Sequence, residues 1–290
     1  MKKKLIIIGG GAAGFFAAIN AAELHPTLEV QILEGSAKVL QKVKVSGGGR
    51  CNVTHACFTP SELVEFYPRG KKELRGPFHQ FMTGDTMEWF ENRGIPLKIE
   101  DDNRMFPESN SSQTIIDCFL ESATNAGVIL KTSTRVDSIK KENERFIVKT
   151  NLEEFIADYV LVASGSNTKV WNMMQDLGHS IIQPVPSLFT FNIKDDRLQD
   201  IPGISVPKAS VKVLNSKLAE HGPLLITHWG LSGPGILKLS AWGALELNKK
   251  NYQFEIEVNW LSKEVPTLSV LTVMIKEVKS SPLYTSSLPK

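Results

Sequence analysis

A glycine pattern between an apolar run and an alanine-rich run most constrains the fold of this chain. Residues 4–8 are short, apolar and rich in isoleucine, which predicts a buried strand. Residues 12–24 are rich in alanine and predict a helix, and residues 28–33 predict a second strand. A strand–helix–strand unit of about 30 residues is the smallest module of a doubly wound parallel sheet. The N-terminal segment is therefore expected to begin an α/β domain.

The glycines that connect the first strand to the helix form the pattern Gly-x-Gly-x-x-Gly. Gly9 permits the tight turn, Gly11 lets the backbone approach a pyrophosphate, and Gly14 lets helix and strand pack closely. The first turn of the helix adds unpaired N–H groups and a partial positive charge, which suit a diphosphate. We therefore predict a dinucleotide site that includes Gly9, Gly11, Ala12, Ala13 and Gly14.

An acidic residue follows the second strand at the position where such sites bind ribose. Glu34 lies twenty residues after Gly14, and its carboxylate can accept hydrogen bonds from the ribose hydroxyls. A carboxylate there also repels the additional phosphate of NADP, and no arginine follows closely. The alternative is a glycine-rich turn with a chance surface glutamate. The pattern predicts a site for FAD or NAD.

A second glycine-rich loop extends from Ser46 to Asn52. Three consecutive glycines leave successive N–H groups free to form an anion-binding concavity. Arg50 adds a donor fork that suits a phosphate or stacking on a ring. A flexible surface loop is the alternative from spacing alone. Its place after the ribose-binding glutamate favours a second contact with the dinucleotide.

Charge and apolar patterning exclude several classes of protein. The net charge is +2, which argues against a nucleic-acid-binding protein, and the lysines at 2–4 are expected to form a solvated tail. The first apolar run is interrupted by glycine after residue 8, unlike a secretory signal. No apolar stretch approaches the roughly 20 residues that cross a bilayer. We expect a soluble, cytoplasmic protein without a membrane partner.

The chain changes character around Pro184-Val185-Pro186. Before it, helices alternate with strand-like runs; after it, β-type alternation dominates. We predict a first domain over residues 1–185 and a β-rich second domain over 186–290. Further helices are expected at 61–67, 71–82, 85–93, 111–126 and 230–244, and further strands at 128–131, 135–140, 145–149, 189–193, 209–214 and 252–258, with a buried parallel strand at 158–163.

Several motifs together resemble the aminoacetone-oxidase-like FAD family, which includes reductases linked to bile-acid dehydroxylation. They occur in order between residue 4 and about residue 260, so the resemblance is more specific than any one motif. The motifs are the two glycine loops, Arg104-Met-Phe-Pro107, Ala163-Ser164-Gly165, Leu177-Gly-His179 and Gly230-Leu-Ser-Gly-Pro-Gly235.

The resemblance implies a flavoenzyme with a Rossmann-like FAD-binding domain and an inserted β-rich second domain. It implies that Glu34 binds the adenosine ribose and that backbone groups of Val136 meet the adenine. The remaining residues that it assigns to FAD are Lys42, Gly48, Gly49, Arg50, Cys51, Asn52, Ala163, Ser164 and Gly165.

The sequence departs from this family at two places. Ser164 stands where relatives usually have threonine, and because the hydroxyl is kept we expect FAD binding to survive. Relatives also continue beyond residue 290, and residues 265–290 do not match them. The resemblance therefore implies a C-terminally shortened chain whose second domain is incomplete.

The sequence assigns no catalytic residue. Cys51 could be a redox thiol with Cys57 as its partner, but a packed cysteine is the simpler interpretation. His228 could be an acid or base, or a structural histidine. Ser232 resembles a helix cap. The six histidines show no metal-ligand spacing, and no metal is expected.

The expected function is an FAD-dependent oxidoreductase that acts on a small organic substrate by hydride or electron transfer. An oxidase and a reductase that uses NAD(P)H as a transient donor both fit. Two other classes stay open: an NAD-linked dehydrogenase, and a catalytically silent nucleotide-binding module.

Overall fold

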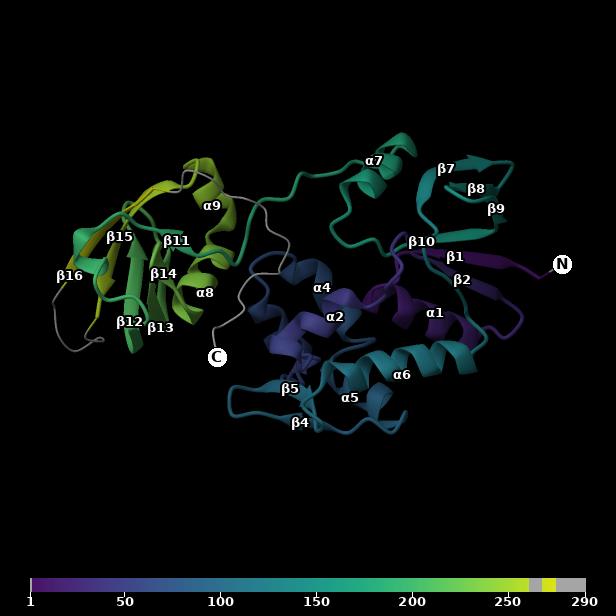
Figure 1. Ribbon diagram of the computed structural model, residues 1–290, viewed down its shortest axis with the longest axis horizontal. Coiled ribbons are helices and arrows are strands. Elements are labelled where there is room, and N and C mark those ends of the chain that lie inside the picture. Colours follow the sequence, from purple (N-terminus) through teal and green to yellow (C-terminus); the bar gives the residue numbers. More distant parts are fainter. Residues whose placement is uncertain (1, 261–267, 275–290) are drawn as a thin grey trace. The chain divides into compact units, whose positions relative to one another are not determined.

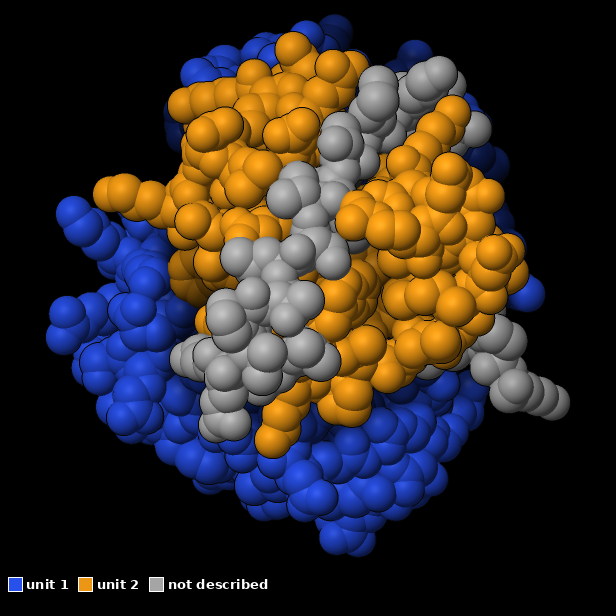
Figure 2. Space-filling model, turned by 90° about the vertical axis from the view of Figure 1, so that its left-hand side faces the viewer, with its two compact units in different colours: residues 1–181, 283–290 blue, residues 182–282 orange. Residues whose placement is uncertain are grey.

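The computed structural model describes residues 2–260 and 268–274 (Figure 1). The chain divides into two compact units, which Figure 2 colours separately: one ends at residue 181 and the other begins at residue 182. The sequence placed this boundary between residues 185 and 186. In the described chain, no helix is long and apolar enough to cross a membrane.

A four-stranded parallel sheet forms the centre of the first unit. Its order is β10–β1–β2–β6, and each neighbouring pair is parallel. The predicted α/β class and the first strand–helix–strand unit are confirmed. The strands are β1 (Lys4–Ile8), β2 (Glu29–Leu33), β6 (Ile129–Lys131) and β10 (Tyr159–Val162).

The two faces of this sheet bury alternate side chains of β1, as the period of two in a strand requires. Leu5 and Ile7 belong to a core that helices α1 (Ala12–Leu24) and α6 (Ser112–Asn125) complete. Ile6 and Ile8 belong to a second core. Leu33 of β2, a three-stranded antiparallel sheet and α7 (Thr168–Asp176) contribute the other buried side chains of that second core.

This antiparallel sheet has the order β7–β8–β9, with β7 at Val136–Glu142, β8 at Arg145–Thr150 and β9 at Glu154–Ala157. The sequence predicted the first two strands and missed β9, which is only four residues long. The prediction of a parallel strand over 158–163 is confirmed, but the prediction that it is buried is wrong. Strand β10 is parallel to β1, but Tyr159 is 46% and Val162 36% exposed, because β10 is an edge strand in the described chain.

Small elements between β2 and α6 complete the first unit. The helix expected over 71–82 ends at Phe78, and a new helix begins at Thr83. The strands β3–β5–β4 form a small antiparallel sheet. The elements are α2 (Gln41–Val45), a 3-10 turn (Ser46–Gly49), β3 (Thr54–His55), α3 (Pro60–Leu63), a 3-10 turn (Val64–Phe66), α4 (Lys71–Phe78), α5 (Thr83–Glu91), β4 (Leu97–Ile99) and β5 (Arg104–Pro107).

The second unit is a six-stranded antiparallel sheet with two helices. The helix expected over 230–244 begins only at Pro234, and Gly243 separates it from a second helix. The sequence missed β13, which is polar in its first half. In sheet order the strands are β11 (Phe191–Asn192), β14 (Gly230–Ser232), β13 (Ala219–Thr227), β12 (Ser205–Val213), β15 (Gln253–Asn259) and β16 (Leu268–Met274); a 3-10 turn covers Asp196–Leu198, and the helices are α8 (Pro234–Trp242) and α9 (Ala244–Lys249).

Candidate functional site

Two glycines of the first loop are required by the fold itself. Gly9 has a φ of +115°, and a β-carbon on it would lie 2.5 Å from the carbonyl oxygen of Ala163. A β-carbon on Gly14 would lie 2.0 Å from the carbonyl oxygen of Gly9. Both distances are far inside van der Waals contact. Glycine at these positions lets α1 and the segment after β10 approach the end of β1.

Gly11 differs from these two glycines. Its φ of −92° is open to any residue, and a β-carbon on it would have no atom within 4 Å. The packing of the described chain therefore gives no reason for glycine at this position. Ala12 and Ala13, in the first turn of α1, are exposed, and no side chain caps that turn. Exposed N–H groups behind an unshielded glycine fit a diphosphate that approaches the backbone.

The Glu34 side chain is fixed beside this loop. One carboxylate oxygen accepts a hydrogen bond of 2.8 Å from the Gly10 N–H, and the other accepts one of 2.8 Å from the Ser36 N–H. The residue is half-buried, and each carboxylate oxygen retains a second acceptor site. The carboxylate can therefore accept from ribose hydroxyls without changing its orientation.

A cleft of about 570 Å³ lies at the carboxyl ends of β1, β2 and β10. The structure brings four predicted residues together in its wall: Gly9, Glu34, Val136 and Ser164. Between β1 and β10 the strand order reverses, and in open parallel sheets ligands bind at such a switch point. Residues of the wall that sequence reasoning missed include Ser36, Thr134, Arg135, Asn167 and Lys169. Asn167 and Lys169 follow β10, so knowing that β10 lies beside β1 would have placed them at this cleft.

Lys42 lies beside the loop that follows β10. Its ammonium group donates to the Ser166 hydroxyl at 3.3 Å. A β-carbon on Gly165, whose φ is +59°, would lie 3.4 Å from the same nitrogen. The structure thus brings Lys42 and the Ala163–Gly165 segment together. An exposed ammonium at this place can contact an anionic ligand.

The second glycine loop is a left-handed turn. Gly47, Gly48 and Gly49 have φ angles of +56°, +70° and +86°. Arg50 returns to a φ of −96°, and Cys51 is again left-handed at +62°. A β-carbon on Gly47 would lie 2.7 Å from the Asn52 nitrogen, so glycine is required there. At Gly48 a β-carbon would meet nothing within 4 Å. Glycine at this position is favoured by the left-handed backbone and not by contact with a neighbour, unlike Gly11, whose φ is negative.

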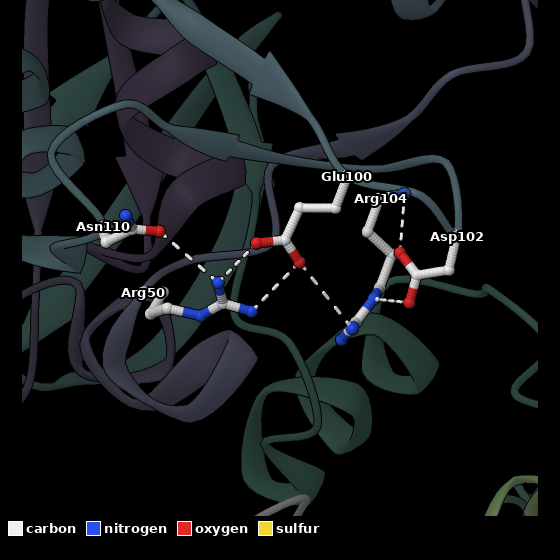
Figure 3. A network of polar contacts seen from close by, with 5 residues as sticks. All are labelled: Arg50, Glu100, Asp102, Arg104 and Asn110. Atoms are coloured by element: carbon white, nitrogen blue, oxygen red, sulfur yellow. Dashed lines mark hydrogen bonds and ion pairs between the residues drawn. The ribbon is translucent and has the colours of Figure 1, made fainter.

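The Arg50 guanidinium is engaged within the protein (Figure 3). It donates to both carboxylate oxygens of Glu100, at 2.6 and 3.2 Å, and stacks 3.9 Å from the centroid of the Phe106 ring. The hydrogen bond from Arg50 lowers the pKa of Glu100. Arg104 extends the network, with 3.9 Å between its guanidinium and Glu100 and 2.7 Å to Asp102. The side chain of Arg50 thus ties the glycine loop to β4 and β5.

The cysteines are buried thiols. Burial raises the pKa of Cys51, and Cys51 belongs to the apolar core of the first unit. Cys57 is also buried, and neither cysteine forms a disulfide. A buried thiol whose pKa is raised is a poor nucleophile, which supports the interpretation of Cys51 as a packed residue.

The second unit contains two further residues that the sequence analysis considered, His228 and Ser232. His228 is exposed in the turn between β13 and β14. Ser232 is the last residue of β14, and the N-cap of α8 is Gly233, so the prediction of a serine cap was wrong. Among the described residues, no group of three or more His, Cys, Asp or Glu side chains could bind a metal ion.

Comparisons with known proteins agree with this geometry. The chain is 27% identical over 239 residues to the 3-dehydro-bile acid delta(4,6)-reductase of Clostridium scindens, an alignment that covers 79% of this chain and 58% of that relative. It is 25% identical over 290 residues to the ribosomal RNA dihydrouridine synthase of Haemophilus influenzae, covering 93% of this chain and 70% of the relative. The chain thus spans little more than half the length of the bile-acid reductase.

Among solved structures, the THI4 protein of Thermovibrio ammonificans is similar with a TM-score of 0.44 and 12% identity, covering 64% of this chain and 67% of that one. The family model described as "HI0933-like protein Rossmann domain" matches residues 3–286. The expectation that residues 265–290 do not match the family was therefore wrong for residues 265–286. The dinucleotide loop, the parallel sheet and this match lead to one conclusion: the chain belongs to the HI0933-like Rossmann-domain family.

Proposed function

We propose that this chain binds FAD across the carboxyl edge of its parallel sheet and forms the cofactor-binding part of an oxidoreductase. The observation that carries the proposal is Gly11, a glycine that the described packing does not require and that stands in front of an uncapped, exposed helix start. FAD, when bound, supplies hydride transfer. The protein's own residues bind and orient it.

The residues divide into backbone and side-chain contacts. The N–H groups of residues 11–14 would bind the pyrophosphate, since the N–H groups of Gly9 and Gly10 donate to Leu33 and Glu34. Gly9 would contribute through the turn that its conformation permits, and Glu34 would bind the adenosine ribose. Lys42 and the segment Ala163–Gly165, which lie together, would bind a further part of the cofactor.

The other contacts use the backbone. At Val136 and in the loop Gly48–Asn52, backbone groups would contact FAD. Arg50 would act on the cofactor only through the position of the loop, because its guanidinium is paired with Glu100.

The relatives' names favour a reductase over an oxidase. A delta(4,6)-reductase and a dihydrouridine synthase both add two hydrogen atoms to a carbon–carbon double bond of a ring. We propose the same reaction class here. One carbon receives a hydride that originates from NAD(P)H, the other receives a proton from water, and NAD(P)+ is released. The acceptor is a planar ring with a double bond conjugated to a carbonyl.

The absorption spectrum of the purified protein tests the cofactor. A yellow protein that releases FAD on heating is expected. A colourless protein that binds NAD and refuses FAD would instead support the NAD-linked dehydrogenase. Gly11→Ala is the matched variant, and it should weaken FAD binding without unfolding the chain.

The reaction class is tested on the FAD-loaded protein without oxygen. Bleaching of the flavin by NADH or NADPH, followed by recovery of colour with a steroid dienone or a uridine oligonucleotide, supports the reductase. Bleaching of the flavin by an amine, which is oxidised to an imine, followed by fast recovery of colour when oxygen is admitted and reduced to hydrogen peroxide, would support the oxidase. Bound FAD that no donor bleaches would indicate the silent binding module.

A further inference from the structure

A second cleft, of about 550 Å³, lies in the first unit between Asn52 and Thr86. Its wall is aromatic: the rings come from β3, from the end of the 3-10 turn after α3, and from the ends of α4 and the segment that follows it. No side chain with a full charge is among the described residues that line this cleft. The aromatic members are His55, Phe66, Tyr67, Phe78 and Phe81.

These rings are paired at the wall and are only partly covered. His55 and Phe66 have ring centroids 4.8 Å apart, and Tyr67 and Phe78 have centroids 5.5 Å apart. Phe66 is nevertheless 59% exposed and Phe81 40% exposed. Clustered exposed rings around a recess are typical of a binding site, since single exposed apolar residues are usually scattered. Such rings present faces on which a planar ligand can stack.

Basic residues lie in the same stretch of chain. Between Phe66 and Phe81 the sequence has Arg69, Lys71, Lys72 and Arg75 and a single acid, Glu73. Lys72 and Arg75 are exposed on α4, the helix whose last residue is Phe78. Residues three apart on a helix are neighbours, so Arg75 is next to the cleft residue Phe78. Lys71 is paired with Glu65, so Lys72 and Arg75 are the exposed basic side chains of α4 that lie near this uncharged aromatic recess.

We infer that this cleft binds one unstacked base of a single-stranded nucleic acid, while Lys72 and Arg75 contact the flanking phosphates. Aromatic stacking platforms beside a basic track are how single strands are bound without a duplex. The uncharged wall suits a base, and the basic helix suits a phosphate backbone. The expectation against nucleic acid came from the net charge of the whole chain, which does not report where single basic residues such as Lys72 and Arg75 lie.

The position of Asn52 connects this cleft to the proposed oxidoreductase. Asn52 lines the cleft and also ends the loop Gly48–Asn52 that we assign to FAD. If the proposed function holds, the bound base is the ring that is reduced; the inference rests on the proposed function in that respect. Binding of the strand itself depends only on the aromatic and basic residues. A membrane surface fits less well, because the rings surround a recess and α4 has only eight residues.

The test is fluorescence anisotropy of the full chain with labelled RNA and DNA oligonucleotides of about ten nucleotides. Single strands should bind more tightly than a duplex of the same length. Phe66→Ala with Tyr67→Ala should weaken binding at least about tenfold, as expected for a lost stacking contact. Lys72→Glu with Arg75→Glu should lower the salt slope by about two. The RNA and DNA arms show whether the 2′-hydroxyl contributes.

Matched controls make the test decisive. Lys140→Glu with Lys149→Glu makes the same change of charge on the exposed side of the β7–β8 pair and should leave binding unchanged. Three outcomes would overturn the inference. They are an equal loss of oligonucleotide affinity in this control, equal affinity for single strand and duplex, and binding to anionic phospholipid vesicles without binding to oligonucleotides. FAD binding is measured on the same samples. Loss of FAD with retained strand binding would contradict only the proposed function.

Discussion

The Glu34 carboxylate accepts a hydrogen bond from the backbone N–H of Gly10, so the acid at the end of β2 is attached to the glycine loop at the end of β1. Glu34→Gln replaces one acceptor oxygen with a donor. We expect FAD affinity to fall about tenfold to a hundredfold, because hydrogen bonds to a charged group are worth about 1.5–3 kcal/mol. Titration of apoprotein with FAD, followed by flavin fluorescence, measures this.

Glu29→Gln is the control for this variant. Glu29 lies at the other end of β2 and pairs with Lys4 at 3.0 Å, remote along the strand from the cleft. The same change of charge there should leave FAD affinity at the native value. Equal losses in both variants would mean that net charge, and not the contact with ribose, determines binding.

Gly11 and Gly14 should respond to alanine in opposite ways. In Gly14→Ala the new β-carbon meets the Gly9 carbonyl oxygen, which should cost about 1–3 kcal/mol of unfolding free energy or more. In Gly11→Ala the β-carbon meets no protein atom, so unfolding in urea should shift by less than about 1 kcal/mol. FAD affinity should fall at least about tenfold in Gly11→Ala. A stable Gly11→Ala protein with native affinity would remove the main support for the cofactor site.

The Arg50–Glu100 pair should make stability depend on pH. The hydrogen bond from Arg50 lowers the pKa of Glu100 below its ordinary value of 4.5. A carboxyl with a lower pKa in the folded chain stabilises the fold above its unfolded pKa, and this contribution is lost as pH falls through the folded pKa. The difference in Tm between about pH 7 and about pH 3 should therefore be smaller in Glu100→Gln than in the native chain.

The comparison for this variant is Glu108→Gln, which removes an exposed carboxylate nearby in the chain. Its Tm should depend on pH as the native chain's does. If Glu100→Gln also leaves the dependence of Tm on pH unchanged, the Arg50–Glu100 pair positions the glycine loop without stabilising the fold.

The Cys51 thiol should react slowly with alkylating reagents. Burial raises its pKa and lowers the thiolate fraction, and the thiolate is the species that reacts. Iodoacetamide at neutral pH should modify Cys51 far more slowly in the folded protein than in the unfolded protein, as judged by mass spectrometry. Cys51→Ser should keep FAD binding and the same spectrum. Fast labelling of Cys51 in the folded chain would revive the redox-thiol hypothesis.

The N-terminal part of the fold was predictable because its signals are local. Strand β1, helix α1 and strand β2 each have a clear apolar period, and the glycine pattern fixes the turn between them. Strand β10 shows what local sequence patterns do not predict. Its residues predicted a buried strand, but its place beside β1 and its exposure depend on which strands neighbour it, and no local pattern encodes that.

In the candidate site, too, local signals were predictable and contacts between distant parts of the chain were not. Glu34 and Gly11 were assigned from spacing, and their geometry suits the role. The partner of Arg50 was not predictable, since Glu100 is fifty residues away and meets it only when the β4–β5 hairpin folds against the loop. The aromatic cleft was missed because its rings come from several short elements without a common period.

Gly11 has a consequence for how such chains diverge. Selection for folding acts on Gly9 and Gly14, where any side chain collides with backbone, but gives no reason to keep Gly11. A lineage that stopped binding a dinucleotide would retain Gly9 and Gly14 and accumulate substitutions at position 11. The residue found at this position in a relative would therefore distinguish a fold that only keeps its architecture from one that still binds the cofactor.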